Sequence, residues 1–268
     1  MVELIRYNGN FVDCKRQIEN ANQRIATARE GLLDRIKQGP NSNYERKGCW
    51  YPEGTVRIEG INFWCLGKFA PTMHYPQETL YANSGKKYLR LTDEINLGKK
   101  PAKEVIKKIL ELDAKKPVEQ RRVLQSSNQS KKYSIQTSDF GNQEVPVFLA
   151  RSPEVAQKYG DFLNKQCGIP EVNVYQISKD TQPDEDIAVG FWLCGLGRGY
   201  DSIFVGDSWG FGSADGFLFG VAKREALSHR KKSDLPLAYK PNDLKILKEV
   251  KDGRIPNKAL EKITQRFL

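Results

Sequence analysis

The chain has 268 residues, of which 39% are hydrophobic and 28% are charged; this composition excludes disorder throughout and lets one large domain bury a substantial core. No apolar run approaches the roughly 18 residues of a membrane span, and the N-terminus lacks a secretory signal, so we expect a cytoplasmic protein with no membrane partner. The formal net charge of +10 is concentrated in residues 98–132 and 221–251, which favours an acidic partner such as nucleic acid.

The five cysteines are widely spaced, odd in number and never arranged as C-x-x-C. This pattern argues against both a disulfide framework and a zinc site. The two histidines, His74 and His229, are far apart and are not near other residues at metal-ligand spacing. We therefore expect reduced thiols and no metal site, and the sequence identifies no cofactor.

The N-terminal region predicts one long amphipathic helix over residues 13–38, stopped by a Gly-Pro pair. Ile18, Ile25 and Leu32 recur every seven residues on its apolar stripe. Packing of this helix on its own domain is one interpretation. Assembly of a homo-oligomer through the helix is the other.

The pattern then changes to that of strands. Residues 55–59 alternate apolar with polar, and residues 61–66 are almost entirely apolar, which predicts a hairpin that turns near Gly60. Residues 80–81 and 88–91 have the composition of two further short strands.

A helix is predicted from Pro101 to about Asp113, because proline is favoured at the first helical position and apolar residues recur on one face. The polar, basic stretch that follows, at about 114–135, has no clear periodicity and is expected to be a linker or lid. Its basic residues are candidate contacts to nucleic acid: Lys115, Lys116, Arg121, Arg122, Lys131 and Lys132.

A β-α-β passage is predicted next. Residues 145–150 form a wholly apolar run, which is expected to be a strand. The sequence Ser152-Pro153-Glu154 then has the residue types of a helix start, and that helix is expected to run to about Lys165. Residues 172–177 are expected to form the second strand.

The glycine-rich stretch 187–224 predicts three buried strands, at 188–193, 202–205 and 216–222. The connections 195–201 and 206–215 hold exposed polar and aromatic residues, and loops on a rigid sheet commonly carry function. Their candidate ligand-binding residues are Arg198, Asp201, Asp207, Trp209, Phe211 and Asp215.

The C-terminal region again contains basic residues. Arg230, Lys231 and Lys232 form a run that is a further candidate nucleic-acid contact. A strand at 244–250 and a closing helix from about Asn257 are predicted after it.

One order of motifs resembles that of the ADP-ribosyltransferases. It consists of Asp139-Phe140-Gly141, the run PVFLARSPEVAQKYG, the strand from Val172 to Tyr175, and Tyr200-Asp201-Ser202-Ile203. The resemblance implies two small sheets that clamp NAD. The family carries a His or Arg on its first strand, whereas the matching stretch here, residues 80–85, has neither.

Taken together, the sequence predicts an α+β protein with a mostly antiparallel twisted sheet, an N-terminal amphipathic helix and a few flanking helices. Residues 1–47 are expected to be a helical segment, and residues 48–268 an α+β domain. The leading functional interpretation is a protein that binds or processes nucleic acid. The alternatives are an ADP-ribosyltransferase-like, NAD-dependent transferase and an interaction protein that assembles through its N-terminal helix.

Overall fold

A computed structural model describes residues 3–40, 48–83, 88–177, 185–194, 202–205 and 216–222. The chain divides into two compact units, Met1–Lys223 and Arg224–Leu268. All described residues belong to the first unit. The strand and helix expected after residue 243 therefore lie outside the described residues.

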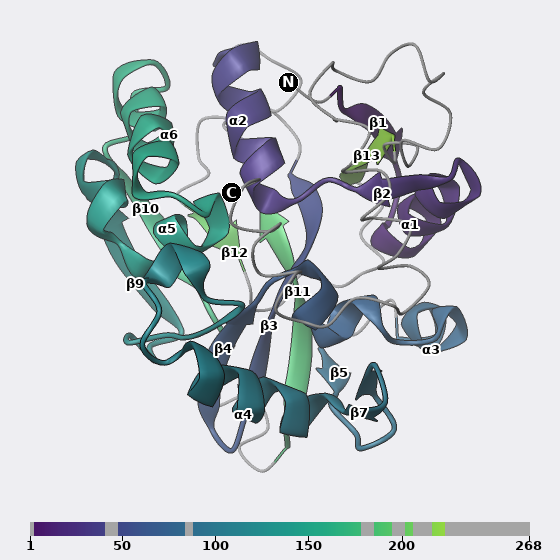
Figure 1. Cartoon of the computed structure of the whole chain (residues 1–268). Coiled ribbons are helices and arrows are strands. Elements are labelled where there is room, and N and C mark those ends of the chain that lie inside the picture. The colour runs from purple at the N-terminus through teal and green to yellow at the C-terminus, as the bar shows by residue number, and fades with distance from the viewer. Residues whose placement is uncertain are drawn as a thin grey trace, which may run out of the picture. The chain divides into compact units, whose positions relative to one another are not determined.

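A mixed, 11-stranded sheet forms the centre of the first unit (Figure 1). Its strand order is β1-β13-β3-β11-β12-β10-β9, with β2, β4, β5 and β8 attached beside this path. Pairing is antiparallel except between β10 and β12 and between β13 and β3, so the expected α+β class with a mostly antiparallel sheet is confirmed. The strands are β1 (Ile5–Asn8), β2 (Gln23–Ile25), β3 (Cys49–Ile58), β4 (Ile61–Cys65), β5 (Leu89–Arg90), β8 (Val123–Gln125), β9 (Lys132–Gln136), β10 (Glu171–Tyr175), β11 (Ile187–Leu193), β12 (Ser202–Val205) and β13 (Phe217–Ala222), while β6 (Asn96–Leu97) and β7 (Lys100–Pro101) pair separately.

Helices cover both faces of the sheet. One core cluster packs the sheet against α2 (Ala28–Gln38), α5 (Glu144–Ala150) and α6 (Pro153–Lys165). The other packs it against α1 (Phe11–Asn20), α3 (Gln77–Ala82) and α4 (Ala102–Asp113). Short 3-10 turns complete the fold: η1 (Gly67–Phe69), η2 (Pro71–Met73), η3 (Val118–Gln120) and η4 (Thr137–Asn142). Among the described residues, no helix is long and apolar enough to cross a membrane.

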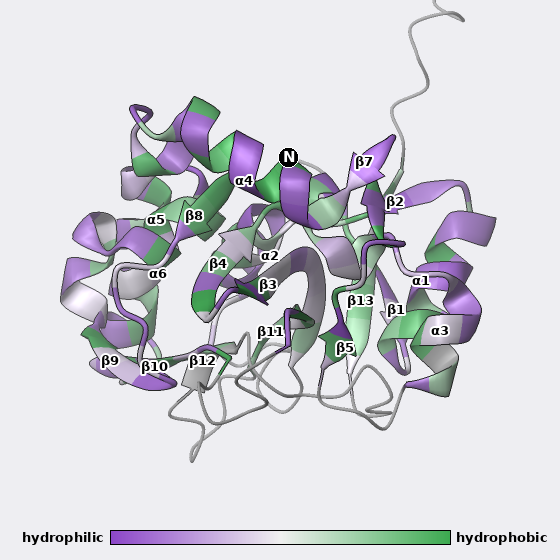
Figure 2. Ribbon diagram, turned by 90° about the horizontal axis from the view of Figure 1, so that it is seen from below, coloured by the Kyte–Doolittle hydropathy of each residue, from purple (hydrophilic) through white to green (hydrophobic). Residues whose placement is uncertain are grey.

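The hydropathy of the elements follows from this layering. Figure 2 shows hydrophilic and hydrophobic residues side by side on α1 and α6, whereas β13 is largely hydrophobic. A helix at the surface needs one apolar face only, but a strand with helices on both sides needs apolar residues on both faces.

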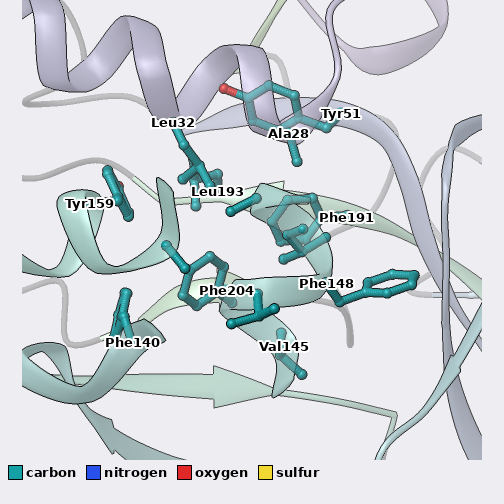
Figure 3. Close-up of a cluster of buried hydrophobic side chains, with 14 of the residues drawn as sticks. Ala28, Leu32, Tyr51, Phe140, Val145, Phe148, Tyr159, Phe191, Leu193 and Phe204 are labelled. Atoms are coloured by element: carbon teal, nitrogen blue, oxygen red, sulfur yellow. The ribbon is translucent and has the colours of Figure 1, made fainter. Parts of the chain in front are cut away.

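Strands β3 and β11 are buried along their whole described length. Tyr51, Phe191 and Leu193 point into the cluster beside α2, α5 and α6 (Figure 3). Trp50 and Trp192 belong to the cluster on the opposite face. Because successive side chains of a strand point to opposite faces, an unbroken apolar run here satisfies both cores.

The β3–β11 pairing contains one irregularity. Its register shifts between Gly190 and Phe191, so Pro52 and Glu53 of β3 have no register partner on β11. Proline has no N–H to donate to the ladder and is tolerated at such a bulge. The bulge lets the Glu53 side chain reach α2, where its Oε2 accepts a hydrogen bond from the N–H of Ala28 at 3.0 Å.

The single long helix expected at residues 13–38 is wrong. The region forms α1, then β2, then α2, and the chain turns at Asn22, whose φ is 53°. The three residues of the supposed stripe therefore lie on three different elements. The capping box of Thr27 and Glu30, which starts α2, was visible in the sequence as T-x-x-E.

The strands expected at residues 145–150 and 80–81 are also wrong, because these residues belong to α5 and α3. A short apolar run cannot by itself distinguish a buried strand from a buried helix. Helix α5 is buried from Val145 to Ala150, and Arg151 ends it with a φ of 57°.

Other local predictions are confirmed. The hairpin turns at Glu59 and Gly60, both with positive φ, and Ser152 caps α6 by accepting from the N–H of Val155.

Two segments that the sequence set apart contribute to the sheet. Residues 114–135, expected to be a linker or lid, contain η3, β8 and the start of β9, and these strands pair with β4 and β10. Residues 3–40 contribute β1 and β2 to the sheet and α1 and α2 to its two faces.

Close packing between α2 and β3 leads to a first prediction. A Cβ added at Gly31 would lie 1.8 Å from the hydroxyl of Tyr51. We expect Gly31→Ala to destabilise the protein by roughly 2 kcal/mol, although alanine is the better helix former. In the control Gly67→Ala, the nearest atoms to the new Cβ are 3.8 Å away, and we expect a change within about 0.5 kcal/mol. Urea unfolding measures both, and equal stabilities would contradict this packing.

Candidate functional site

The expected ligand-binding connections begin and end on strands that the structure describes. Connection 195–201 joins β11 to β12, and connection 206–215 joins β12 to β13. At these ends, Leu193 pairs with Phe204 on one side and with Cys49 on the other, and Cys49 also pairs with Phe217. The four strands β12, β11, β3 and β13 therefore present their ends next to one another. We call this set of ends the strand-end frame.

A buried arginine fixes the end of β11. The Arg35 guanidinium, on α2, is fully buried and donates hydrogen bonds to the carbonyl oxygens of Leu193 at 3.0 Å and Cys194 at 2.7 Å. It also donates to the hydroxyl of Tyr159 on α6 at 3.3 Å. Figure 3 shows Leu193 between Leu32 of α2 and the cluster around Phe204. One cation thus ties the last residues before connection 195–201 to two helices.

Aromatic packing fixes the start of β13. Trp192 stacks edge-on against Trp50, with ring centroids 4.5 Å apart. A Cβ at Gly48 or at Gly216 would lie 2.1 Å or 2.6 Å from the Trp192 ring, so only glycine fits at either position. The N–H of Gly9 also donates to the carbonyl of Gly216 at 3.1 Å. The residue that follows connection 206–215 is therefore held by packing and by a hydrogen bond.

The Glu53 carboxyl supports the helix that carries Arg35. Its side chain is buried, and burial raises its pKa from 4.5 to about 7, although the hydrogen bond from Ala28 and the charge of Arg151 oppose the shift. The N-terminus of α2 therefore rests on a carboxyl that changes charge near neutral pH.

Two adjoining hollows lie at the opposite end of β11. The first, of about 780 Å³, is lined by Thr79 of α3, by Arg90 of β5, and by Asn83 and Tyr88, which lie between these two elements in the chain. The second, of about 460 Å³, shares Arg90 with it. Ion pairs cross the second hollow: Arg90 with Glu185 at 2.7 Å, and Lys103 with Asp186 at 2.6 Å. These pairs are partly exposed, so each contributes little to stability.

Three of the nine expected nucleic-acid contacts form bonds within the chain. Arg122 makes a bidentate ion pair with Asp113, with N–O distances of 2.8 and 2.7 Å, and Lys116 lies 2.8 Å from the same carboxylate. These contacts hold the pKa of the Asp113 carboxyl well below its usual range. Arg121 donates to the carbonyl of Lys116.

The remaining candidates are scattered or outside the description. Lys132 lies over the Tyr175 ring, 5.4 Å from its centroid, and Lys115 and Lys131 are exposed. Outside the described residues lie Arg198, Asp201, Asp207, Trp209, Phe211, Asp215, Arg230, Lys231 and Lys232. Sequence reasoning missed Arg35 and Glu53, because nothing local distinguishes them from the other charged residues of the chain.

Metal ligands and cysteines bear on the chemistry that a site could perform. Within the described ranges, no three His, Cys, Asp or Glu side chains are grouped so that they could hold a metal ion. All five cysteines are free: Cys14, Cys49, Cys65, Cys167 and Cys194.

Comparison with known proteins identifies the fold. No model of a protein family matches the sequence, and no curated protein matches it significantly. Among solved structures, the chain is similar to a protein described under "Accommodation of massive sequence variation in Nanoarchaeota by the C-type lectin fold". The TM-score is 0.56 at 12% identity, and the match covers 82% of this chain and 98% of that chain. The first unit therefore has a C-type-lectin-like fold.

This finding overturns the functional expectations. The fold is C-type-lectin-like, and the comparison supports neither nucleic-acid binding nor NAD-dependent ADP-ribosyl transfer. The basic residues Arg121, Arg122 and Lys116 form bonds within the chain. The motif order that resembled the transferases needed a strand at 145–150, which is a helix. Assembly through one N-terminal helix is also wrong, because Ile18 and Leu32 are buried in two different cores.

The Arg35 contacts lead to a second prediction. We expect Arg35→Met to destabilise the protein by roughly 3 kcal/mol, because the carbonyls of Leu193 and Cys194 lose a charged donor inside the core. Arg29→Met, at an exposed position of the same helix, is the matched control and is expected to change stability by less than about 0.5 kcal/mol. Urea denaturation of the three proteins measures the difference. A loss no larger than that of the control would show that Arg35 is dispensable.

The raised pKa of Glu53 leads to a third prediction. Between pH 4.5 and about 7 the Glu53 carboxyl of the folded protein binds a proton that the carboxyl of the unfolded protein has released, and this binding stabilises the folded state. The stabilisation is complete below pH 4.5 and is lost as pH rises through 7. The loss is on the order of 3 kcal/mol. We expect Glu53→Gln to remove this part of the difference in unfolding free energy between pH 5 and pH 8. The exposed Glu94→Gln is the control, and an unchanged pH profile in Glu53→Gln would refute the assignment.

Proposed function

We propose that the protein recognises a ligand through connections 195–201 and 206–215, which the strand-end frame of a C-type-lectin-like fold carries. The observation that supports this most directly is the double hydrogen bond from buried Arg35 to the carbonyls of Leu193 and Cys194, where the first connection begins. A binding surface gains affinity when its supports are rigid, because less conformational freedom is lost on binding.

The residue types of the two connections suit recognition. Trp209, Phe211 and Arg198 belong to classes that are enriched at binding hot spots, and the three aspartates add polar, directional contacts. The six proposed contact residues are Arg198, Asp201, Asp207, Trp209, Phe211 and Asp215.

Tolerance of substitution at these six positions is part of the proposal. The structurally similar protein is described as accommodating massive sequence variation by the C-type lectin fold. In this chain, the frame is stabilised by the hydrogen bonds from Arg35 to Leu193 and Cys194. It is also stabilised by the packing of the Trp192 ring against Gly48 and Gly216. Its stability is therefore expected to be independent of the six residues.

We also propose a cytoplasmic, reducing location. Four of the five free cysteines are buried, and none is paired with another. Burial raises the pKa of the Cys14 and Cys49 thiols, to about 11 and about 12 respectively, which keeps them protonated and unreactive.

A fourth prediction tests the proposed function. A variant with all six residues changed to alanine is expected to unfold at nearly the same temperature as the wild type, because the frame is unchanged. On arrays of glycans and of peptides, the wild type is expected to bind at least one class, and the six-residue variant to lose that binding at least tenfold.

The control for this experiment changes six exposed residues elsewhere to alanine: Lys99, Lys108, Glu111, Lys115, Lys131 and Lys158. It is expected to retain the binding pattern of the wild type. Two results would sink the proposal: an unfolded six-residue variant, which would make the connections structural, or a variant that binds the arrays as the wild type does.

A further inference from the structure

A third hollow lies apart from the strand-end frame, between α1 and β2 on one side and η1 and η2 on the other. Its volume is about 580 Å³, which is in the range of sites for small organic molecules. The apolar part of its lining consists of Ile18, Ile25, Pro52 and Met73.

The fold creates this hollow through features already described. Among the described residues, β2 pairs with β13 alone, and its three residues, Gln23, Arg24 and Ile25, line the hollow. Pro52 lies in the β3 bulge, and Gly67 of η1 has no side chain to fill the space beside it. A Cβ added at Gly67 would meet only Pro52, at 3.8 Å. Partly buried Ile25 and Met73 pack against the core beneath, so their remaining exposed surface belongs to the hollow.

The charged side chains at the rim differ in whether they form ion pairs. Arg24 donates to both carboxylate oxygens of Glu30, at 2.8 and 2.5 Å, so its charge is neutralised. Glu19 lies 3.6 Å from the ammonium of Lys15. Lys68 is exposed and lies over the Phe69 ring, and it forms no ion pair with any acidic residue that the structure describes. Among the residues that the structure describes, the rim therefore offers one available cation.

His74 lies next to this cation. Its Nε2 is bonded to the carbonyl of Lys68 at 2.8 Å, which holds the imidazole at the rim. Because a carbonyl oxygen only accepts, Nε2 carries the hydrogen of the neutral imidazole, and Nδ1 is then an acceptor that offers a carboxylate no hydrogen bond. A carboxylate at this rim would therefore be held by the full positive charge of Lys68, over an apolar floor.

We propose that the third hollow binds a small amphipathic carboxylate, with its apolar body against Ile25, Pro52 and Met73 and its carboxylate beside Lys68. This site is independent of the six residues of the proposed function. The apolar contact supplies most of the affinity, and the charge contact selects carboxylates over uncharged analogues.

A fifth prediction tests this site with decanoate and 2-naphthoate as probes, which distinguish alkyl from aromatic bodies, and with 1-decanol and 2-naphthol as uncharged counterparts. Isothermal titration is expected to show binding of at least one carboxylate. Its uncharged counterpart is expected to bind at least tenfold more weakly. Lys68→Gln is expected to weaken carboxylate binding roughly tenfold and to leave binding of the alcohol unchanged.

Two further variants make the test specific. Met73→Trp fills the hollow and is expected to abolish binding, while Lys108→Gln, at an exposed position of α4, is expected to bind as the wild type does. Failure of the wild type to bind either carboxylate at millimolar concentration would overturn the proposal, as would equal affinities of Lys68→Gln and Lys108→Gln. Tighter binding of a peptide through its C-terminal carboxylate would also overturn it, in favour of a protein partner. The six-residue alanine variant is expected to bind the carboxylate normally, so the two proposals fail independently.

Discussion

The pairing of β3 with β11 is the constraint on which the rest of the structure depends. Both strands are buried along their described length, because helices cover both faces of the sheet. Every backbone polar group in this pair must be satisfied by the ladder, since water does not reach it. The register of the pair is interrupted at Pro52 and Glu53, and there the Glu53 carboxyl bonds to the N–H of Ala28 in the first turn of α2. This contact helps to position α2, and with it Arg35.

Both proposed binding regions trace back to the same two strands. At one end of β11, Arg35 and Trp192 hold the strand-end frame from opposite faces of the sheet. At the bulge, Pro52 contributes to the floor of the third hollow. A buried strand pair of this kind can carry variable surface segments, because the energy of the fold lies in the two cores and not in the connections.

Net charge proved a poor guide to function in this chain. A cluster of basic residues between Lys115 and Lys132 has the composition of a nucleic-acid contact. Asp113, nearly inaccessible at the end of α4, instead gathers Arg122 and Lys116 around it. A buried carboxylate needs such partners, since an unpaired charge in the interior is costly. Part of the positive charge is therefore structural, and composition alone cannot separate that part from charge available to a partner.

The sequence by itself determined the elements whose signals are local. The cap at Ser152 predicts α6, the glycine at position 60 predicts the hairpin, and the apolar runs at 188–193 and 202–205 predict β11 and β12. Only the tertiary structure decided the rest. The run at 145–150 is apolar throughout, and such a run can be buried either as a strand or as a helix. In the structure it forms the buried helix α5. The heptad-like spacing of Ile18, Ile25 and Leu32 is accidental, because the chain turns at Asn22 and pairs β2 with β13. Arg35 meets Leu193 across 158 residues of sequence, and a contact of that separation leaves no local pattern, because it exists only after the sheet and its helices have assembled.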